Sequence, residues 1–380
     1  MHPYTPICRM VELPFELVDL IIDELKHDIV ALRSCSLVCK TWLPRSSAHL
    51  FSSFRISSLP SWTFLIDYHN LLSSSTRVPA FTRNLEVNVV PERAQAIAAL
   101  IQHLPQLDSL SLVGIGLFRD SSCFPRPNLS CTGRTLRSLR GAWLPADLIA
   151  CFLALFTSVE TLDVRFGERA EHDFRQQAHR ITNLVIKAET DFALLDIACL
   201  VRPDALESLA VDIGGTYHHQ VAAERFDKLL QLVGRHIKRF EYAQPLGGWV
   251  APPSSIPALF ACAALESITV TTPKASPFSM RLWLECLVLL SSLLPHVQRV
   301  RLVTSCRGLP EAEHAFQDLV RTLDWQGVAQ ALVHCRALEV VEVAALDCCH
   351  RPIAFVDYPG AREAVVGRMP AWLRSIAVFE

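Results

Sequence analysis

The residues of this chain that could bind a metal or act as nucleophiles are its 13 cysteines and 14 histidines. Cys35 and Cys39 stand one helical turn apart, and Cys348, Cys349 and His350 are consecutive. A structural zinc site usually takes two well-spaced pairs of such ligands, and the sequence has no Cys-x-x-Cys pair. Free cysteines that pack as small apolar core residues are the better interpretation. We therefore predict neither a metal site nor a cofactor.

The sequence also lacks the common motifs of catalysis. It contains no G-x-S-x-G turn, no phosphate-binding P-loop, no H-E-x-x-H and no G-x-G-x-x-G. No spacing fixes a nucleophile beside a base, although a site assembled from distant residues is left open. We predict that the chain is not an enzyme.

One short apolar pattern returns many times along the chain and indicates the elements of secondary structure that position its side chains. The pattern is apolar-x-x-apolar-x-apolar, and its last two apolar positions have strand spacing, with both side chains on one face. Its copies begin at Phe51, Leu107, Val159, Ile181, Leu206, Ile237, Leu265, Val297, Leu338 and Leu373. Two weaker copies fill gaps, one with Leu85 and Val87 and one in which Gly141 takes the last apolar place.

Helical patterns lie between many of these copies, for example from Phe226 to Val233 and from Leu282 to Leu293. Successive copies lie 22 to 41 residues apart, mostly 22 to 32. Strand and helix that alternate at this spacing predict an α/β fold, a leucine-rich-repeat-like solenoid. Its parallel sheet should have roughly ten to twelve strands. Most copies lack the asparagine or cysteine usual in such repeats, so the repeats are degenerate. An unrelated α/β fold with regular strands is the alternative.

Residues between the inward strand positions should face solvent on the concave side of this sheet. Asp163, Arg165, Lys187 and Asp212 form a charged middle zone there, and we predict that it binds a client protein. Trp249 lies among glycines and prolines, should be exposed, and is a further candidate for client binding. The alternative is that these residues only keep the solenoid soluble.

A separate helical pattern occupies the first fifty residues. Leu13 and Pro14 open a first helix, on which Leu17, Ile21 and Leu25 recur every four residues and share one face. So small a unit cannot bury its own apolar surface well, and we expect it to need a partner.

A second helix should follow directly. Asp28 is placed to cap it, because the carboxylate can accept hydrogen bonds from otherwise unpaired N–H groups. The residues that this helix is predicted to carry are Leu32, Cys35, Val38, Cys39 and Trp42. Pro44 should mark its end, because proline cannot donate to a helix and restricts the residue before it.

This segment resembles the F-box, in the form found in fungal F-box proteins. The resemblance lies in Leu13-Pro14, Glu16-Leu17, Ile21, Leu25, Leu32, the run Leu37-Val38-Cys39-Lys40 and Trp42. It implies docking on a Skp-family adaptor and, through it, on a cullin-type ubiquitin ligase. The adaptor-binding residues predicted in this register are Leu13, Pro14, Leu17, Ile21, Leu32, Val38 and Trp42. An ordinary helical hairpin is the alternative.

The predicted organisation is a tail at 1–10, an F-box at 11–50 and a degenerate leucine-rich-repeat-like solenoid at 51–380. The predicted function is substrate recognition in a Skp/cullin-type E3 ubiquitin ligase, with an unknown client on the repeat domain and catalysis in other subunits. The alternative is a protein-binding scaffold that does not direct ubiquitin transfer.

Composition agrees with a folded, intracellular chain. A content of 51% apolar and 19% charged residues argues against disorder over most of the chain. A net charge of −2 without a large basic block argues against nucleic-acid binding. The first ten residues lack the apolar core of a signal peptide, and no apolar run reaches the roughly 18 residues of a membrane span. We expect a cytoplasmic or nuclear location.

Overall fold

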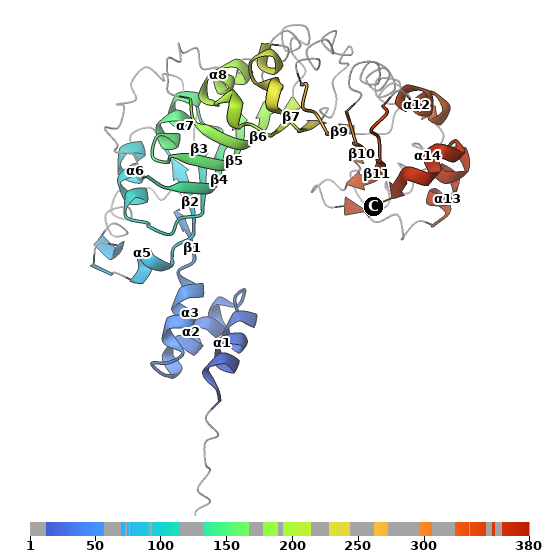
Figure 1. The fold of residues 1–380 in the computed structure, drawn as a ribbon. Helices are drawn as coiled ribbons and strands as arrows, with labels where there is room; N and C mark the ends of the chain where they lie inside the picture. Colours follow the sequence, from blue (N-terminus) through green and yellow to red (C-terminus); the bar gives the residue numbers. More distant parts are fainter. Residues whose placement is uncertain are drawn as a thin grey trace, which may run out of the picture. The chain divides into compact units, whose positions relative to one another are not determined.

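The computed structural model of this protein places most of the residues that it describes in helices and strands (Figure 1). The residues that it describes are 13–56, 70–72, 74–75, 77–90, 93–114, 133–166, 178–188, 193–213, 228–243, 262–272, 296–305, 324–333, 335–346, 352–353 and 359–379. The chain forms two compact units: Met1–Asn88 with Gln95–Ser111, and Val89–Ala94 with Leu112–Glu380. The domain boundary predicted near residue 50 stays a prediction.

The first unit begins with three short helices, α1 (Phe15–Glu24), α2 (Ile29–Val38) and α3 (Leu43–Leu50). The predicted cap of the second helix is confirmed, since the Asp28 carboxylate accepts from the backbone N–H groups of Val30 and Ala31 at 3.0 and 2.9 Å. Val18, Ile22 and Leu32 are the buried core of these helices, and Leu25, Trp42 and Leu50 pack against it.

The predicted end of the second helix is wrong. α2 stops at Val38, so Cys39 and Trp42 lie outside it, and Pro44 stands in the first turn of α3. Proline is well suited to that turn, because its missing N–H would have no partner within the helix and its fixed φ is already helical. Pro44 therefore marks the start of a helix rather than the end of one.

The strands of the sheet follow one another in chain order, and the hydrogen-bonded order is β1 to β12, with β13 beside β11. The first elements after α3 are β1 (Ser53–Ile56), α5 (Arg77–Phe81), β2 (Asn84–Val89), α6 (Ala94–Gln102) and β3 (Ser109–Gly114). The next are β4 (Thr135–Ala142), α7 (Ala146–Leu153), β5 (Ser158–Phe166), β6 (Arg180–Ala188), α8 (Ala193–Leu200), η3 (Pro203–Ala205) and β7 (Ser208–Ile213).

The last part of the second unit repeats the same alternation. Its elements are η4 (Gly234–His236), β8 (Arg239–Ala243), β9 (Ser267–Thr272), β10 (Arg299–Ser305), α12 (Trp325–Leu332), β11 (Val340–Leu346), β12 (Pro352–Ile353), α13 (Pro359–Arg368), α14 (Ala371–Ile376) and β13 (Ala377–Phe379). The predicted helix after Phe226 is confirmed over residues 228–233, whereas the predicted helix at 282–293 lies outside the described residues.

Parallel register between neighbouring strands stacks the apolar positions into columns. Leu162 of β5 aligns with Leu184, Leu209, Phe240 and Ile268 on the next four strands, and all five side chains are buried. Helices α7 and α8 lie along one side of β4–β7 in Figure 1, so one face of the sheet is covered and the other is exposed. This is the predicted α/β fold, a leucine-rich-repeat-like solenoid with a parallel sheet.

Gly141, which takes an apolar place in its copy of the repeat, has a steric reason to be glycine. A Cβ at this position would lie 3.3 Å from Cδ1 of Ile149 on α7 and 3.7 Å from Cγ1 of Val164 on β5. The glycine thus lets the Ile149 side chain of α7 pack closely on β4, and a Cβ here would require that side chain to shift.

The last copy of the pattern differs from the prediction. Leu373 and Ile376 lie on α14, and the strand that follows begins at Ala377. A spacing of three residues fits one face of a helix as well as it fits this repeat, and Leu373 is buried from the helix. In consequence Val378, not the predicted Ala377, aligns with Glu342. The two-residue β12 is also antiparallel to β11, whereas the sequence predicted parallel strands throughout.

Candidate functional site: an apolar helical face and a charged sheet face

The first candidate site is a set of large apolar side chains that α1, α2 and the residues before α1 leave in solvent. This helical apolar set consists of Leu13, Phe15, Leu17, Leu20, Ile21, Ile29, Val30, Leu37 and Val38. Val30 and Leu37 are 74% and 86% exposed. On α1, Leu17, Leu20 and Ile21 share one face and Val18 and Ile22 another, because residues three and four apart share a face. So many exposed large apolar side chains on a small unit are typical of a binding surface.

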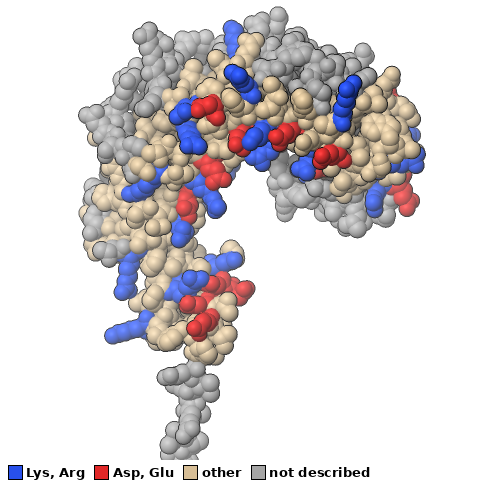
Figure 2. Space-filling view, in the orientation of Figure 1, with Lys and Arg blue, Asp and Glu red and all other residues tan. Residues whose placement is uncertain are grey.

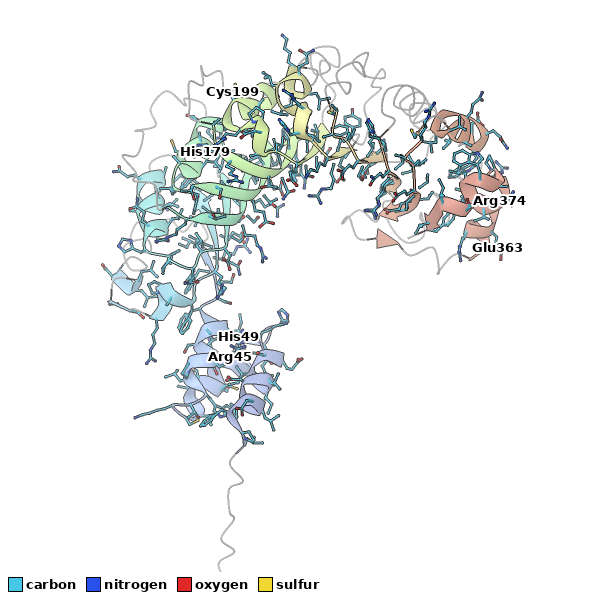
Figure 3. All side chains as sticks on the ribbon, in the orientation of Figure 1. Arg45, His49, His179, Cys199, Glu363 and Arg374 are labelled. Carbon is cyan, nitrogen blue, oxygen red and sulfur yellow. The ribbon has the colours of Figure 1, made fainter. Side chains whose placement is uncertain are left out.

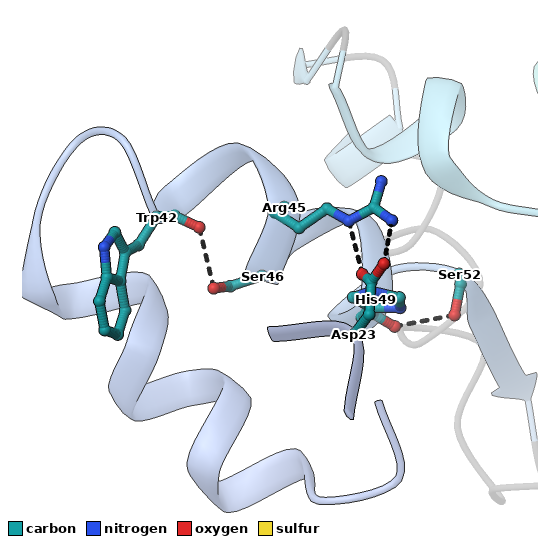
Figure 4. A network of polar contacts seen from close by, with 6 residues as sticks. All are labelled: Asp23, Trp42, Arg45, Ser46, His49 and Ser52. Carbon is teal, nitrogen blue, oxygen red and sulfur yellow. Dashed lines mark hydrogen bonds and ion pairs between the residues drawn. The ribbon is translucent and has the colours of Figure 1, made fainter. Parts of the chain in front are cut away.

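The helices beneath this set are tied together by an ion-pair network (Figure 4). Asp23 near the end of α1 accepts from both Nε and Nη2 of Arg45 on α3, the first at 2.6 Å. Nε2 of His49 lies 2.7 Å from the same carboxylate. The hydrogen bonds from Arg45, and then from His49, hold the pKa of Asp23 well below its usual range. One carboxylate therefore joins α1 to α3 and fixes the face that α1 presents.

The structure separates the predicted adaptor-binding residues into two groups. Leu13, Pro14, Leu17, Ile21 and Val38 are exposed. Leu32 is 1% exposed and lies in the core, and the half-buried Trp42 packs against that core. Leu32 and Trp42 can therefore support the surface from inside, but only the exposed group can supply a broad contact with a partner.

Sequence reasoning missed five members of the helical apolar set. They are Phe15, Leu20, Ile29, Val30 and Leu37. A signal was available, because α1 reads FELVDLIIDE and holds more large apolar residues than one core-facing stripe needs. The excess has to face outward.

The second candidate site is the exposed face of the sheet in the second unit. At the middle position of each strand, the register aligns one row of residues: Arg140, Asp163, Val185, Ala210, Glu241, Thr269, Arg301 and Glu342. The sequence predicted that these side chains face away from the core. Figure 2 shows basic and acidic side chains interspersed on this unit, without a large area of one sign.

Several charges of this face neutralise each other between strands. Arg140 lies 3.6 Å from Asp163, and Arg299 and Arg301 both reach the carboxylate of Glu342, at 3.4 and 3.3 Å. Glu342 is held between two cations, so it contributes to the cohesion of β10 and β11. The pair of Arg140 and Asp163 is neutral, whereas two arginines share the one carboxylate of Glu342.

The predicted client-binding residues are brought together in one region. The register aligns Arg165 with Lys187 and Lys187 with Asp212, one row beyond Asp163. Asp163 is half-buried and paired with Arg140, so it is less available than predicted. Trp249 lies outside the described residues.

A residue that the sequence did not single out lies beside this region. Trp143 follows the end of β4, is exposed, and carries the guanidinium of Arg165 over its ring at 4.4 Å from the centroid. Its backbone has φ of +61°, and its N–H donates to the carbonyl oxygen of Arg165 at 2.7 Å. The repeat spacing gives no hint of this residue, because it lies outside the repeated positions.

The described parts of the chain contain no side-chain cluster suited to metal binding. Groups of three or more His, Cys, Asp or Glu that could hold a metal are absent among these residues. Burial raises the pKa of the Cys262 thiol to about 12 and lowers that of His179, which keeps both groups uncharged at neutral pH. Figure 3 labels His179 and Cys199 within the second unit. The candidate cluster Cys348 to His350 lies outside the described residues.

The pKa of the exposed Cys39 thiol is lowered. The cause is a hydrogen bond with the Thr41 hydroxyl, at 2.8 Å between Sγ and Oγ1, followed by one with the backbone of Trp42. A hydroxyl is not a general base, so this contact gives the thiol no catalytic partner. As for membranes, none of the helices within the described ranges is long and apolar enough to span one.

Comparison with known proteins adds a distant likeness. No protein-family model matches the chain, and no curated protein matches it significantly. Among solved structures, the chain is similar to the crystal structure of the leucine-rich repeat-containing protein LegL7 from Legionella pneumophila. The alignment covers 84% of this chain and 99% of that one, at 13% identity and a TM-score of 0.41. The fold assignment rests on the strand order and register of this chain itself.

Proposed function

We propose that the N-terminal helices of this chain form an F-box that docks a Skp-family adaptor. The repeat unit holds a client protein, and the chain serves as the substrate-recognition subunit of a cullin-type E3 ubiquitin ligase. The chain itself is non-catalytic, and its contribution is to bring the client close to the catalytic subunits. Such a role belongs to the cytoplasm or the nucleus.

The observation that supports this proposal best is the helical apolar set. Three short helices bury a small core of Val18, Ile22 and Leu32, yet they leave nine large apolar side chains exposed. Full burial of an exposed side chain of this kind is worth about 1.5–3 kcal/mol. Several of the nine are already about half buried and gain less, but a partner that covers several of them together still binds strongly. In an isolated helical hairpin without a partner, these apolar side chains would stay exposed to water.

The experiment that tests the proposal is binding of the full chain to a purified Skp-family adaptor. Replacing Leu17 and Val38 together by lysine should weaken adaptor binding by at least about a hundredfold, since two buried anchors would each lose about 2 kcal/mol or more. The matched control is Leu232→Lys with Val333→Lys, two exposed apolar residues of the second unit. Equal adaptor affinity in both double variants would refute the F-box assignment.

A non-catalytic scaffold that does not direct ubiquitin transfer is the alternative function. It uses the same repeat unit, but it needs no adaptor. If the wild-type chain does not bind the adaptor, or binds it without assembling with a cullin, the scaffold becomes the better proposal.

A further inference from the structure

The backbone at the end of β4 is held in a conformation that its residue type disfavours. Among the described residues, Trp143 is the one non-glycine residue with positive φ, at 61°. A bulky side chain rarely adopts this region, because its Cβ comes too close to the neighbouring carbonyl oxygen. The conformation is fixed by the hydrogen bond from the Trp143 N–H to the Arg165 carbonyl, at 2.7 Å. Backbone strain of this kind often accompanies binding sites.

The same conformation leaves the indole of Trp143 in solvent rather than in the core. The side chain is 37% exposed, and the Arg165 guanidinium stacks over its ring at 4.4 Å from the centroid. A stacked arginine restricts the rotation of the indole, so the ring is ordered before any partner arrives. Tryptophan and arginine are the residue types that most often carry the binding energy of an interface.

The charges around this indole favour an acidic partner. Arg165 aligns with Lys187 on β6, so two cations stand side by side on neighbouring strands, with Asp212 next to Lys187. In the preceding row, Arg140 and Asp163 neutralise each other at 3.6 Å. The two rows beside Trp143 thus hold three cations, Arg140, Arg165 and Lys187, and two anions, Asp163 and Asp212, and two of the cations, Arg165 and Lys187, are neighbours.

We propose that Trp143, Arg165 and Lys187 form the anchor at which the repeat unit binds an acidic, extended segment of a client protein. An apolar side chain of that segment packs on the exposed part of the indole, and a neighbouring carboxylate lies beside Lys187 and Arg165. This inference rests on the proposed client-binding role of the repeat unit, and it names the chemistry that the client presents.

The test is a selection of short peptides from a displayed random library on the immobilised full chain. The selected peptides should combine Asp or Glu with an adjacent apolar residue, and their binding should weaken as salt increases. Trp143→Ala and Trp143→Gly should each weaken the binding of these peptides by at least about tenfold. Glycine adopts positive φ without strain, so a loss shared by both variants belongs to the indole and not to the backbone.

Two control variants match the test residues. Trp372 on α14 is 39% exposed, which is close to the value for Trp143, and Trp372→Ala should leave peptide binding unchanged. Lys187→Glu should weaken binding at least about tenfold, whereas Lys228→Glu, at another exposed lysine of the same unit, should not.

The outcomes separate this anchor from the function on which it rests. Enriched peptides that bind Trp143→Ala and Trp143→Gly as well as wild type, or that lack acidic residues, overturn the anchor and leave a client-binding repeat unit intact. A library that yields no binder overturns both. Self-association of the chain that is lost in Trp143→Ala would make a second copy, and not an acidic client segment, the occupant.

Discussion

At the scale of single residues, Asp23 has a stabilising role that pH should reveal. Hydrogen bonds from Arg45 and His49 depress its pKa in the folded chain below the ordinary value of 3.8. Its contribution to stability is therefore complete above about pH 4 and is lost as the pH falls toward the folded-state pKa. Asp23→Asn should cost about 1 kcal/mol at neutral pH, the upper end for exposed ion pairs.

The measurement for Asp23 is hydrogen exchange of the amides of α1 in the full chain. Asp23→Asn should speed this exchange by roughly fivefold at neutral pH, and the difference from wild type should shrink below about pH 4. Glu24→Gln, on the same helix, serves as the control. A variant effect that stays constant down to pH 2 would show that the carboxylate charge is irrelevant.

Trp143 should reverse the usual order of alanine and glycine. Its φ of +61° disfavours any residue with a Cβ, so Trp143→Gly should be more stable than Trp143→Ala by about 1 kcal/mol. At the helical Trp372, alanine should instead be the more stable by about 1 kcal/mol. Urea unfolding of the four variants measures both differences. If alanine is the more stable at both sites, the left-handed conformation at Trp143 is wrong.

At the scale of elements, the column of buried side chains holds neighbouring strands together. Leu162→Ala or Leu209→Ala should each cost roughly 2–5 kcal/mol, because both side chains are completely buried and their removal leaves a cavity. Leu232→Ala, at a side chain that is 55% exposed, should cost less than about 0.5 kcal/mol. Unfolding in urea followed by circular dichroism gives these values, and near-equal costs at buried and exposed sites would refute the column.

The connection between α3 and β1 should be rigid. Only Phe51 and Ser52 separate the two elements, and the Ser52 carbonyl accepts from the backbone N–H groups of Arg83 and Asn84 at 3.0 and 2.9 Å. Trypsin should therefore cleave the native chain after Arg45 and Arg55 far more slowly than the urea-unfolded chain. Rapid native cleavage at either arginine would indicate a flexible joint.

The strands could be predicted from the sequence because apolar residues two apart on a strand lie on the same face, and that face is buried. Leu162, Leu184 and Leu209 each occupy the middle of a copy, and each is buried in a parallel strand. The pattern failed at Leu373 and Ile376, where a helix offers the same spacing. It also could not reveal Trp143, because the left-handed conformation of this residue depends on a hydrogen bond that its N–H donates to a neighbouring strand, and such a contact leaves no periodic pattern in the sequence.

The helical surface was predictable only in part, for a similar reason. The sequence shows which residues are apolar, but whether Leu32 or Leu17 faces the core depends on how the three helices pack. Apolar residues spaced four apart share a helix face, and that face can lie in the core or on the surface. Leu32 is buried and Leu17 is exposed. A core needs only one line of apolar residues along each helix. The number of apolar residues beyond that need, and not their spacing, therefore indicated a partner.

At the scale of the whole molecule, adaptor binding and client binding should be separable, because the residues proposed for the two belong to different compact units. Reversing the charge of Arg165 and Lys187 together should abolish capture of an identified client while adaptor affinity stays at the wild-type value. The reason is that two adjacent cations become two anions on a surface that favours an acidic segment, and like charges at an interface cost several kcal/mol. Leu17→Lys with Val38→Lys should abolish adaptor binding and leave client affinity at the wild-type value. Calorimetry with purified adaptor and client measures both affinities in one preparation. A client that still binds the charge-reversed chain normally would place its site elsewhere, and the segment around Trp249 would be tested next with Trp249→Ala.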